Sequence, residues 1–481
     1  MIAQRNGALD GLIDACLFPG VRGTAPPDWA RRAVEQGLGG FVLYGSNAGE
    51  TGGRLDLLAR PLRALRRDLL VAVDEEGGDV TRLDYRDGSR YPGNLALGVV
   101  DDVELTRRVA SSIARDLAEQ ELNLDLAPSV DVNSDPENPV IGTRSFGADA
   151  ELVARHGRAF VEGLQSLGVA ACAKHFPGHG ATRVDSHSGL PVVDCDARTL
   201  RERELAPFAA AIEAGVRSLM SAHVVFPAVD ELPATLSRPF LTGIVRDELH
   251  YDGVVFTDAL EMGAIAARWP LGAAAVQSLA AGADALLIGD RDGERDCAEI
   301  RLAVRAAVDT GDLPRRRVEQ AAERVRRLGA WAAEPSSAGA DDDAAGLEAA
   351  RRALRVEGAL PLAAPPFVVH LRARANPAVG RAHWSLAEVL AQLGFLAGSR
   401  DVVEGDGDVP LPAGPPLVVA CRDAYRSEWQ RAWLAAHPDA VVVALGLPED
   451  RALAGERFVA AFGAGRANVR AAAEALSRSS V

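Results

Sequence analysis

Lysine is almost absent from this chain of 481 residues. Among its 52 lysine and arginine residues, only Lys174 is a lysine. A coding bias towards arginine replaces surface lysines freely, because only their charge matters. A site that needs a compact ammonium group with three donors does not accept arginine in its place. The one lysine that remains therefore indicates a functional position.

Several other features are missing as well. No run of about eighteen apolar residues occurs, which excludes a membrane-spanning helix. The first residues, MIAQRNGALDGLIDACLFPG, lack the basic segment, long apolar core and cleavage site of a signal peptide, so we expect a cytoplasmic protein. Five scattered cysteines without a CxxC pair indicate reduced thiols rather than disulfides or a zinc site. A net charge of −15 argues against nucleic acid or an anionic membrane as partner and leaves a small carbohydrate possible. The sequence leaves the oligomeric state open.

Histidines are concentrated directly after Lys174. The apolar run 169–173, bounded by Gly168 and by Pro177-Gly178, predicts a short buried strand. The segment KHFPGHGATRVDSHSGLP follows, and its proline and glycines prevent a helix. Three imidazoles and a carboxylate therefore lie on a loop after a strand, and functional residues often occupy loops held by a rigid scaffold.

Apolar runs recur along the chain at the spacing of βα units. Eight strands are predicted, over 12–18, 40–44, 69–73, 122–127, 169–173, 218–221, 253–257 and 283–288, with helical segments such as 104–121 and 151–167 between them. This pattern predicts an α/β protein whose residues 1–330 form a (β/α)8 TIM-type barrel. The Pro-, Ser-, Gly- and Asp-containing stretch 331–346 predicts a linker, and residues 347–481 predict a smaller α/β domain without a chemical motif.

Polar residues follow several of the predicted barrel strands. Asp74, the Lys174 cluster, His223 and Asp258 each come directly after one. A single aspartate there is more often a helix N-cap. Barrel enzymes, however, place their active sites at the C-terminal ends of the strands. Polar residues that follow several different strands therefore predict one shared site.

Longer motifs carry a family resemblance. KHFPGHGATRVDSH resembles a loop of glycoside hydrolase family 3, in its bacterial β-N-acetylglucosaminidase branch, and VVFTDALEMGAI resembles the nucleophile segment of that family. AVDEEGGDVTRL and GTRSFG resemble its first substrate-binding segment and its arginine segment, and ELAPF, SAHV and PATLS are further matches. These motifs cover the whole barrel in the same order. The second domain is similar to the shorter C-terminal domain of two-domain members.

The resemblance implies roles for particular residues. Asp258 would be the catalytic nucleophile, and His187 the general acid/base, paired with Asp185. The residues expected to hold the terminal sugar are Asp74, Arg82, Arg144, Lys174 and His175, and no metal or cofactor is implied. Two positions depart from the family pattern. Asp79 stands where the family often has arginine, which we interpret as peripheral, and Ala259 replaces a second aspartate, leaving Asp258 as the candidate in its motif.

The implied function is that of a retaining, exo-acting β-N-acetylglucosaminidase. It would hydrolyse terminal β-linked N-acetylglucosamine through a covalent glycosyl-enzyme, with cytoplasmic turnover of cell-wall muropeptides as its setting. Retaining hydrolysis needs one group to attack the anomeric carbon and another to protonate the leaving oxygen. Histidine suits the second role because a neighbouring carboxylate tunes its pKa near the working pH. Asp185, two residues before His187, is placed for such a hydrogen bond.

Three alternatives stay open at this point. A β-N-acetylglucosaminide phosphorylase would use the same site, since a neutral imidazole does not repel phosphate, although the charge of Asp185 favours water. A metal-dependent barrel hydrolase would use His175 and His179, although Pro177-Gly178 prevents the helical face on which such spacing is useful. A non-catalytic sugar-binding protein would lack Asp258 or His187, and both are present.

Overall fold

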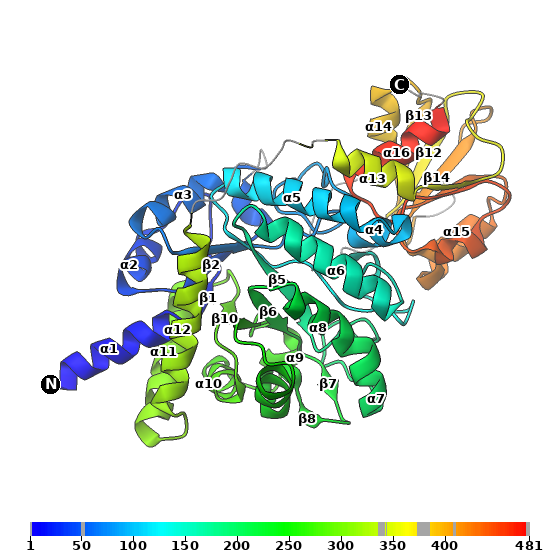
Figure 1. Cartoon of the computed structure of the whole chain (residues 1–481). Coiled ribbons are helices and arrows are strands. Elements are labelled where there is room, and N and C mark those ends of the chain that lie inside the picture. Colours follow the sequence, from blue (N-terminus) through cyan, green and yellow to red (C-terminus); the bar gives the residue numbers. More distant parts are fainter. Residues whose placement is uncertain are drawn as a thin grey trace.

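The computed structural model describes residues 2–49, 53–334, 342, 344–372, 385–406 and 410–477. Figure 1 shows two parts, a large barrel that runs from blue to green along the chain and a smaller domain that runs from yellow to red. No helix within these ranges combines the length and the apolar composition needed to cross a membrane.

The larger part is a closed barrel of parallel strands, which confirms the predicted fold class. Its strands among the described residues are β1 (Leu17–Pro19), β2 (Gly40–Leu43), β3 (Leu70–Val73), β4 (Leu124–Asp125), β5 (Ala170–Phe176), β6 (Ser218–Ser221), β9 (Val254–Thr257) and β10 (Leu286–Ile288). One sheet contains six of these strands, paired in the order β2, β3, β4, β5, β6 and β9, and a second sheet contains β1 paired with β10. Parallel bridges from Gly20 to Val42 and from Phe256 to Ala285 join the two sheets and close the ring.

The first predicted strand is wrong in its first half. Residues 12–14 belong to the helix α1 (Ile2–Asp14), and β1 begins only at Leu17. A short apolar run does not by itself distinguish a strand from a buried helix end. Figure 1 shows α1 at the N-terminal side of the barrel, next to α11 (Gly293–Thr310) and α12 (Arg315–Ala332).

Helices cover the outside of the barrel. Those that pack around the strands are α2 (Asp28–Gln36), α3 (Asp56–Leu65), α5 (Val103–Glu119), α6 (Ala150–Gln165), α8 (Ala206–Glu213), a π-helix (Pro239–Glu248), α10 (Leu271–Ala281), α11 and α12. Aspartates begin several of them: the side chain of Asp102 accepts a hydrogen bond from the amide of Leu105, and Asp149 accepts one from Leu152. A short hairpin of β7 (Val225–Phe226) and β8 (Asp230–Pro233) follows β6.

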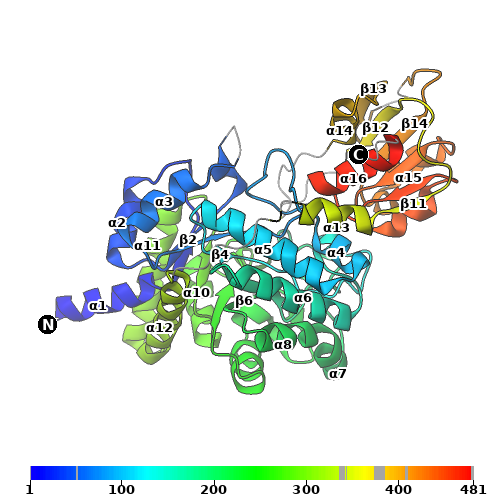
Figure 2. The ribbon, with the colours of Figure 1, turned by 45° about the horizontal axis from the view of Figure 1, so that its top comes forward.

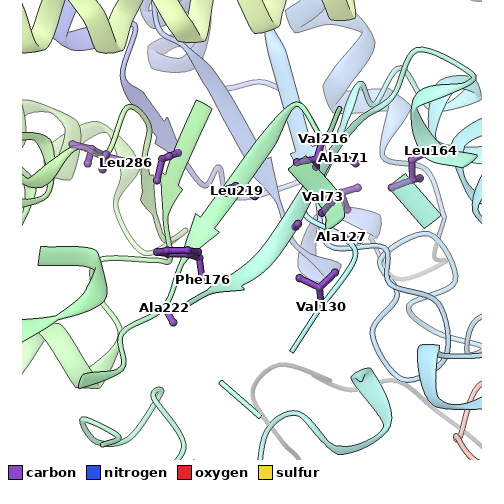
Figure 3. Close-up of a cluster of buried hydrophobic side chains, with 14 of the residues drawn as sticks. Val73, Ala127, Val130, Leu164, Ala171, Phe176, Val216, Leu219, Ala222 and Leu286 are labelled. Atoms are coloured by element: carbon purple, nitrogen blue, oxygen red, sulfur yellow. The ribbon is translucent and has the colours of Figure 1, made fainter. Parts of the chain in front are cut away.

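Apolar side chains fill the barrel on both sides of the strands. Along β3, Leu70 and Ala72 point into the interior, whereas Val71 and Val73 pack against the helices. This alternation is the period of two of a β-strand. Figure 3 shows part of the outer layer around β3, β5 and β6, including Val73, Ala171 and Leu219. Inside the barrel, Phe18 meets Phe256 edge to face, with ring centroids 4.9 Å apart.

The smaller domain is built on a six-stranded sheet in its described part. Its strand order is β11 (Arg355–Glu357), β16 (Phe458–Ala460), β15 (Val441–Ala444), β14 (Leu417–Cys421), β12 (Phe367–Leu371) and β13 (Gly398–Val402), parallel except for β11. The apolar runs 367–371, 417–420 and 440–445 predict three of these strands from the sequence, and β12, β14 and β15 lie there. Helices α14 (Leu386–Gln392) and α16 (Arg466–Ser477) cover one face, and α15 (Glu428–Ala435) packs on the other.

The two parts are in direct contact. Helix α13 (Ala345–Ala353) packs against α4 (Asn94–Val100) and α5 of the barrel as well as against α16 (Figure 2). Helix α12 reaches Ala332 and α13 begins at Ala345, so helices occupy both ends of the stretch 331–346 that was predicted as a linker. Residues 335–341 and 343 of that stretch lie outside the described residues.

Candidate active site

Strand alternation explains why the site residues gather at one end of the barrel. Ala72 on β3, Cys172 on β5 and Phe256 on β9 all point into the interior. The residues two positions later are Asp74, Lys174 and Asp258, so the same period of two directs their side chains inward at the C-terminal mouth. Long segments follow β3, β4 and β5 before the next major helix, and they carry the remaining candidates.

Lys174 lies in the centre of a network of charges. Its Nζ atom is 2.8 Å from Oδ1 of Asp74 and 2.6 Å from Oε1 of Glu76, and the residue is only 1% exposed. Burial alone would lower the pKa of Lys174, but the two carboxylates outweigh it and raise the pKa above its ordinary value. The ammonium group therefore stays charged and holds both carboxylates in fixed positions.

Arg144 and Arg82 extend this network. The guanidinium of Arg144 forms two hydrogen bonds to the carboxylate of Glu76, with N–O distances of 2.9 and 2.7 Å. Arg82 places Nη2 3.6 Å from Oδ2 of Asp74. Burial would raise the pKa of Glu76, but the charges of Arg144 and Lys174 lower it well below the usual range. Glu76 was not singled out from the sequence, although it stands two residues after Asp74.

His175 is oriented by a second carboxylate that the sequence analysis missed. Its Nδ1 atom is 2.7 Å from Oδ2 of Asp131, and its Nε2 atom is 3.3 Å from Nη2 of Arg144. Because a guanidinium only donates, Nε2 of His175 accepts and Nδ1 carries the proton towards Asp131. Asp131 follows the fourth predicted strand within the run APSVDVN, and a carboxylate after a strand end is the signal that would have identified it.

His187 and Asp185 form a hydrogen-bonded pair. The distance from Nδ1 of His187 to Oδ1 of Asp185 is 2.7 Å, and the backbone amide of His187 donates to the same oxygen at 2.9 Å. Burial would lower the pKa of His187, but its hydrogen bond to Asp185 and the charge of that residue raise it above the ordinary value. With Nδ1–H held by Asp185, Nε2 is the atom left for chemistry.

The loop that carries His187 is tied to the segment after β9. The amide of Gly263 donates to the carbonyl oxygen of His187 at 3.3 Å, and the amide of Ala264 donates to that of Ser186 at 3.1 Å. A Cβ atom on Gly263 would lie 2.6 Å from the carbonyl oxygen of His187, so this close approach needs glycine. The loop after β5 therefore reaches across the barrel mouth to the loop that follows Asp258.

Asp258 is fixed by its backbone and surrounded by imidazoles. Its amide donates to the carbonyl oxygen of Ser221 at 3.1 Å, and its Oδ1 atom accepts from the amide of Ala259 at 2.8 Å. Burial would raise the pKa of Asp258, but the neighbouring His223, His175 and His187 lower it below the ordinary value. An ionised carboxylate results, with Oδ2 free of the Ala259 amide.

His223 has a supporting position. It is buried, its Nε2 atom is 3.0 Å from the carbonyl oxygen of Ala259, and its Nδ1 atom is 2.9 Å from Oγ1 of Thr235. Since a carbonyl oxygen only accepts, Nε2 of His223 donates to it. The residue therefore fixes the backbone beside Asp258 and does not line the cavity.

A single cavity of about 770 Å³ unites most of the candidates. Its walls contain Asp74, Arg82, Arg144, Lys174, His175, His187 and Asp258, which are seven of the eight predicted side chains. Asp185 contacts His187 from outside this set of lining residues. On the side of β2 and β10, the wall also contains Tyr44, Glu261, Asp290 and Arg291, which the sequence analysis did not name.

The alternative in which His175 and His179 bind a metal ion is not supported by the hydrogen bonds of His179. His179 has Nδ1 2.8 Å from Oγ1 of Thr182 and Nε2 3.0 Å from Oγ of Ser186, so hydroxyl groups occupy both ring nitrogens. Across the described ranges, no three His, Cys, Asp or Glu side chains converge as ligands of one ion would. Burial lowers the pKa of His179 to about 4, which keeps it neutral as a structural residue of the loop.

Comparison with known families agrees with this geometry. Residues 26–328 match the family model described as the N-terminal domain of glycosyl hydrolase family 3, which is well over half of the chain. The chain belongs to glycosyl hydrolase family 3. The matched region contains every residue of the cavity, so the resemblance stated from the motifs is confirmed at the level of the family.

Individual members of family 3 are similar over much of the chain. The beta-hexosaminidase A of Pseudoalteromonas piscicida is 33% identical over 331 residues, 63% of this chain and 55% of that protein, so the chain spans about half of that relative. The beta-hexosaminidase of Nitrosomonas eutropha is 34% identical over 302 residues, 60% of this chain and 85% of that protein. The solved structure of a family 3 beta-N-acetylglucosaminidase from Paenibacillus sp. str. FPU-7 is 32% identical, with a TM-score of 0.86, and the match covers 97% of this chain and 96% of that chain.

The hydrogen bond between Asp185 and His187 leads to a pH prediction. Asp185→Asn removes the negative charge that raises the pKa of His187, so burial should then dominate and lower it. For a substrate whose leaving group needs a proton, kcat/KM declines as pH rises through the pKa of the acid. We expect the alkaline limb of the kcat/KM profile to move to lower pH in Asp185→Asn. A profile that keeps its alkaline limb in place would contradict this role.

Proposed function

We propose that this protein is a retaining, exo-acting β-N-acetylglucosaminidase that releases terminal β-linked N-acetylglucosamine. The observation that carries the proposal is the cavity that places an ionised Asp258 and a half-buried His187 beside a fixed set of polar and charged sugar-binding groups. The names of the relatives from Pseudoalteromonas, Nitrosomonas and Paenibacillus support the same activity. Since every residue of the cavity lies between positions 42 and 291, we propose residues 1–330 as the catalytic domain and 347–481 as an accessory domain, joined by 331–346.

The proposed reaction has two steps. Oδ2 of Asp258 attacks the anomeric carbon while the bond to the leaving oxygen breaks, and Nε2–H of His187 gives its proton to that oxygen. Nε2 of His187 then takes a proton from water, the water oxygen attacks the anomeric carbon, and Asp258 is released. Asp185 stays ionised and stabilises the imidazolium form of His187 throughout.

The sugar-binding groups are arranged for hydrogen bonds to neutral hydroxyl groups. Each of the cations Lys174, Arg144 and Arg82 contacts Asp74 or Glu76, so donors and acceptors alternate along this wall of the cavity. Such a wall suits the hydroxyl groups of a terminal sugar, which both donate and accept. We propose that these residues, together with His175, hold the sugar whose anomeric carbon Asp258 attacks.

The second candidate, phosphorolysis on the same site, is less well supported by the charges. The lining carries five carboxylates, at Asp74, Glu76, Asp258, Glu261 and Asp290, and four cationic side chains, at Arg82, Arg144, Lys174 and Arg291. Asp185 adds a further negative charge directly behind His187. In the glycosyl-enzyme that the acceptor attacks, Asp258 is an uncharged ester, so the four remaining lining carboxylates balance the four cations. The negative charge of Asp185 behind His187 then disfavours a phosphate dianion and leaves water unaffected.

A panel of aryl β-glycosides, with and without millimolar phosphate, tests the proposal. We expect turnover of the N-acetylglucosaminide above the glucoside and galactoside, with free sugar as the main product in both buffers. A majority of sugar 1-phosphate would identify a phosphorylase with the same catalytic residues. No turnover of any β-glycoside would contradict the enzymatic proposal and favour a sugar-binding protein.

We propose that this protein acts in the cytoplasm, in the turnover of cell-wall muropeptides. The five cysteines are free thiols, and four of them are buried, as is usual for proteins of reducing compartments. Supplying a disaccharide that ends in β-linked N-acetylglucosamine to cytoplasmic extracts with and without this protein tests the assignment. Fractionation of cells that express the protein would show directly whether it stays in the cytoplasm.

His187→Ala should separate substrates by their leaving groups. An activated phenolate leaves without protonation, whereas an ordinary sugar alcohol needs the proton from His187. We expect a much larger loss of kcat/KM for a disaccharide than for a dinitrophenyl glycoside. With the activated substrate, the glycosyl-enzyme should accumulate and add one sugar to the intact mass. Equal losses for both substrates would argue against His187 as the acid.

A further inference from the structure

Asp79 occupies a position that its sequence context does not explain. Its sequence position suggested a peripheral residue, yet Asp79 is only 5% exposed, accepts two hydrogen bonds and forms one ion pair, with partners from three separate segments. Oδ2 accepts a hydrogen bond from Oγ1 of Thr143 at 2.5 Å and forms an ion pair with Nη2 of Arg422 at 2.8 Å. Oδ1 accepts from the amide of Ala464 at 2.8 Å. Two of the three partners, Arg422 and Ala464, belong to the C-terminal domain.

The partners of Asp79 are adjacent to the sugar-binding residues. Asp79 itself lies in the loop after β3, between Glu76 and Arg82. Thr143 directly precedes Arg144, whose guanidinium holds Glu76. Asp79 thus joins the two barrel loops that supply this wall of the cavity, and it joins both of them to the C-terminal domain.

The backbone confirms that this contact is tight. A Cβ atom on Gly465 would lie 3.0 Å from Cα of Gly78, and one on Gly78 would lie 2.5 Å from Gly93. The segment after β16 therefore touches the loop after β3 without a side chain between them. Asp79 directly follows Gly78 at this point of contact. We therefore expect that loss of an Asp79 contact displaces the loop after β3.

A second connection links the same domain to the loop after β4. Nη1 of Arg426 donates to the carbonyl oxygen of Asn138 at 2.6 Å. The side chain of Asn138 accepts from the amides of Val140 and Ile141, just before Arg144, and donates to the carbonyl oxygen of His179 at 2.8 Å. The C-terminal domain thus reaches the start of the loop that carries His187 through Asn138, although none of its described residues lines the cavity.

We propose that Asp79 is a positioning residue through which the C-terminal domain holds the sugar-binding wall of the site in place. A buried carboxylate that loses its cation cannot stay where it is without cost, so the loop must move when Arg422 is removed. Asp74, Glu76 and Arg82 move with that loop, and Thr143 transmits the shift to Arg144. Asp258 follows β9 instead, and its described hydrogen bonds go to Ser221 and Ala259 rather than to the loops that Asp79 joins.

Arg422→Gln in the full-length protein tests the proposal. Misplacing binding groups by about 1 Å has large kinetic effects, so we expect KM for an aryl β-N-acetylglucosaminide to rise by about tenfold, with a smaller change in kcat. Asp79→Asn/Arg422→Gln removes the unpaired charge as well, so its KM should be lower than that of Arg422→Gln. Arg422→Lys retains the charge and should lie near the wild type.

Arg352→Gln is the matched control. It removes another Arg–Asp ion pair between the domains, from Arg352 to Asp102 at 2.8 Å, which is more exposed than that of Asp79 and touches none of the site loops. We expect an unchanged KM and at most a small change in melting temperature, because this pair is partly exposed. An unchanged KM in Arg422→Gln, or an equal rise in Arg352→Gln, would overturn the proposal.

The comparison of KM values rests on the proposed function, because it requires turnover of a β-N-acetylglucosaminide. A second measurement tests the same contact without turnover. Amide hydrogen exchange over residues 74–83 and 138–145 should be faster in Arg422→Gln than in the wild type and unchanged in Arg352→Gln. If the wild type hydrolyses no β-N-acetylglucosaminide, this exchange result still decides the structural role of Asp79. If Arg422→Gln does not fold, Asp79→Asn provides the perturbed variant and Arg422→Lys its control, and wild-type exchange in Asp79→Asn would overturn the proposal.

Discussion

Asp258→Asn should lose more than about 10³-fold in kcat while it keeps the fold, because a covalent nucleophile has no substitute in this site. The side chain is the carboxylate that β9 directs inward, and surrounding imidazoles keep its pKa below the ordinary value. The amide is isosteric and still accepts the hydrogen bond from Ala259. Steady-state rates and a thermal melt together would separate lost chemistry from lost stability.

The matched control for this variant is Asp290→Asn. Asp290 lines the same cavity from the segment after β10 but has no role in the proposed chemistry. It should keep more than about a tenth of the wild-type kcat. Adding azide to Asp258→Ala offers a further test, since an external anion would attack from the side of the missing carboxylate and yield the α-glycosyl azide. Asp258→Asn with a tenth of wild-type activity would contradict the assignment.

Lys174→Arg should lower kcat/KM by about 10²-fold although it conserves the charge. The ammonium group lies between Asp74 and Glu76 at 2.8 and 2.6 Å, with almost no exposure, and Arg144 already occupies the other side of Glu76. The larger planar guanidinium of an arginine has no room there without displacing one of these carboxylates. Binding of N-acetylglucosamine measured by calorimetry should weaken in parallel with the kinetic loss.

Arg198→Lys is the corresponding exchange on the surface. Arg198 pairs with Glu202 at 2.9 Å, and its side chain is 80% exposed. Such a pair contributes between zero and about 1 kcal/mol, so this variant should match the wild type in activity and melting temperature. If Lys174→Arg also turned over substrate normally, the single lysine would reflect codon usage rather than function.

Much of the barrel follows from local sequence. The strands are short apolar runs bounded by turn residues, and their period of two alone directs Asp74, Lys174 and Asp258 towards one mouth. The order of the motifs was enough to indicate the family. Local patterns predict the type of element less well where an apolar run is short. The apolar residues 12–14 end a helix, and the three-residue strands β11 and β16 of the second domain carry too few residues for an alternating pattern.

The sequence by itself determined the candidate residues for the chemistry, because Asp258 follows a strand and Lys174 and His187 lie in a distinctive motif. Only the tertiary structure decided how they are held. Glu76 holds Arg144, which lies 68 residues away along the chain. Asp131 orients His175, which lies 44 residues away. Asp79 meets Ala464 across 385 residues. Such contacts depend on how loops and domains meet in space, and no local period records them.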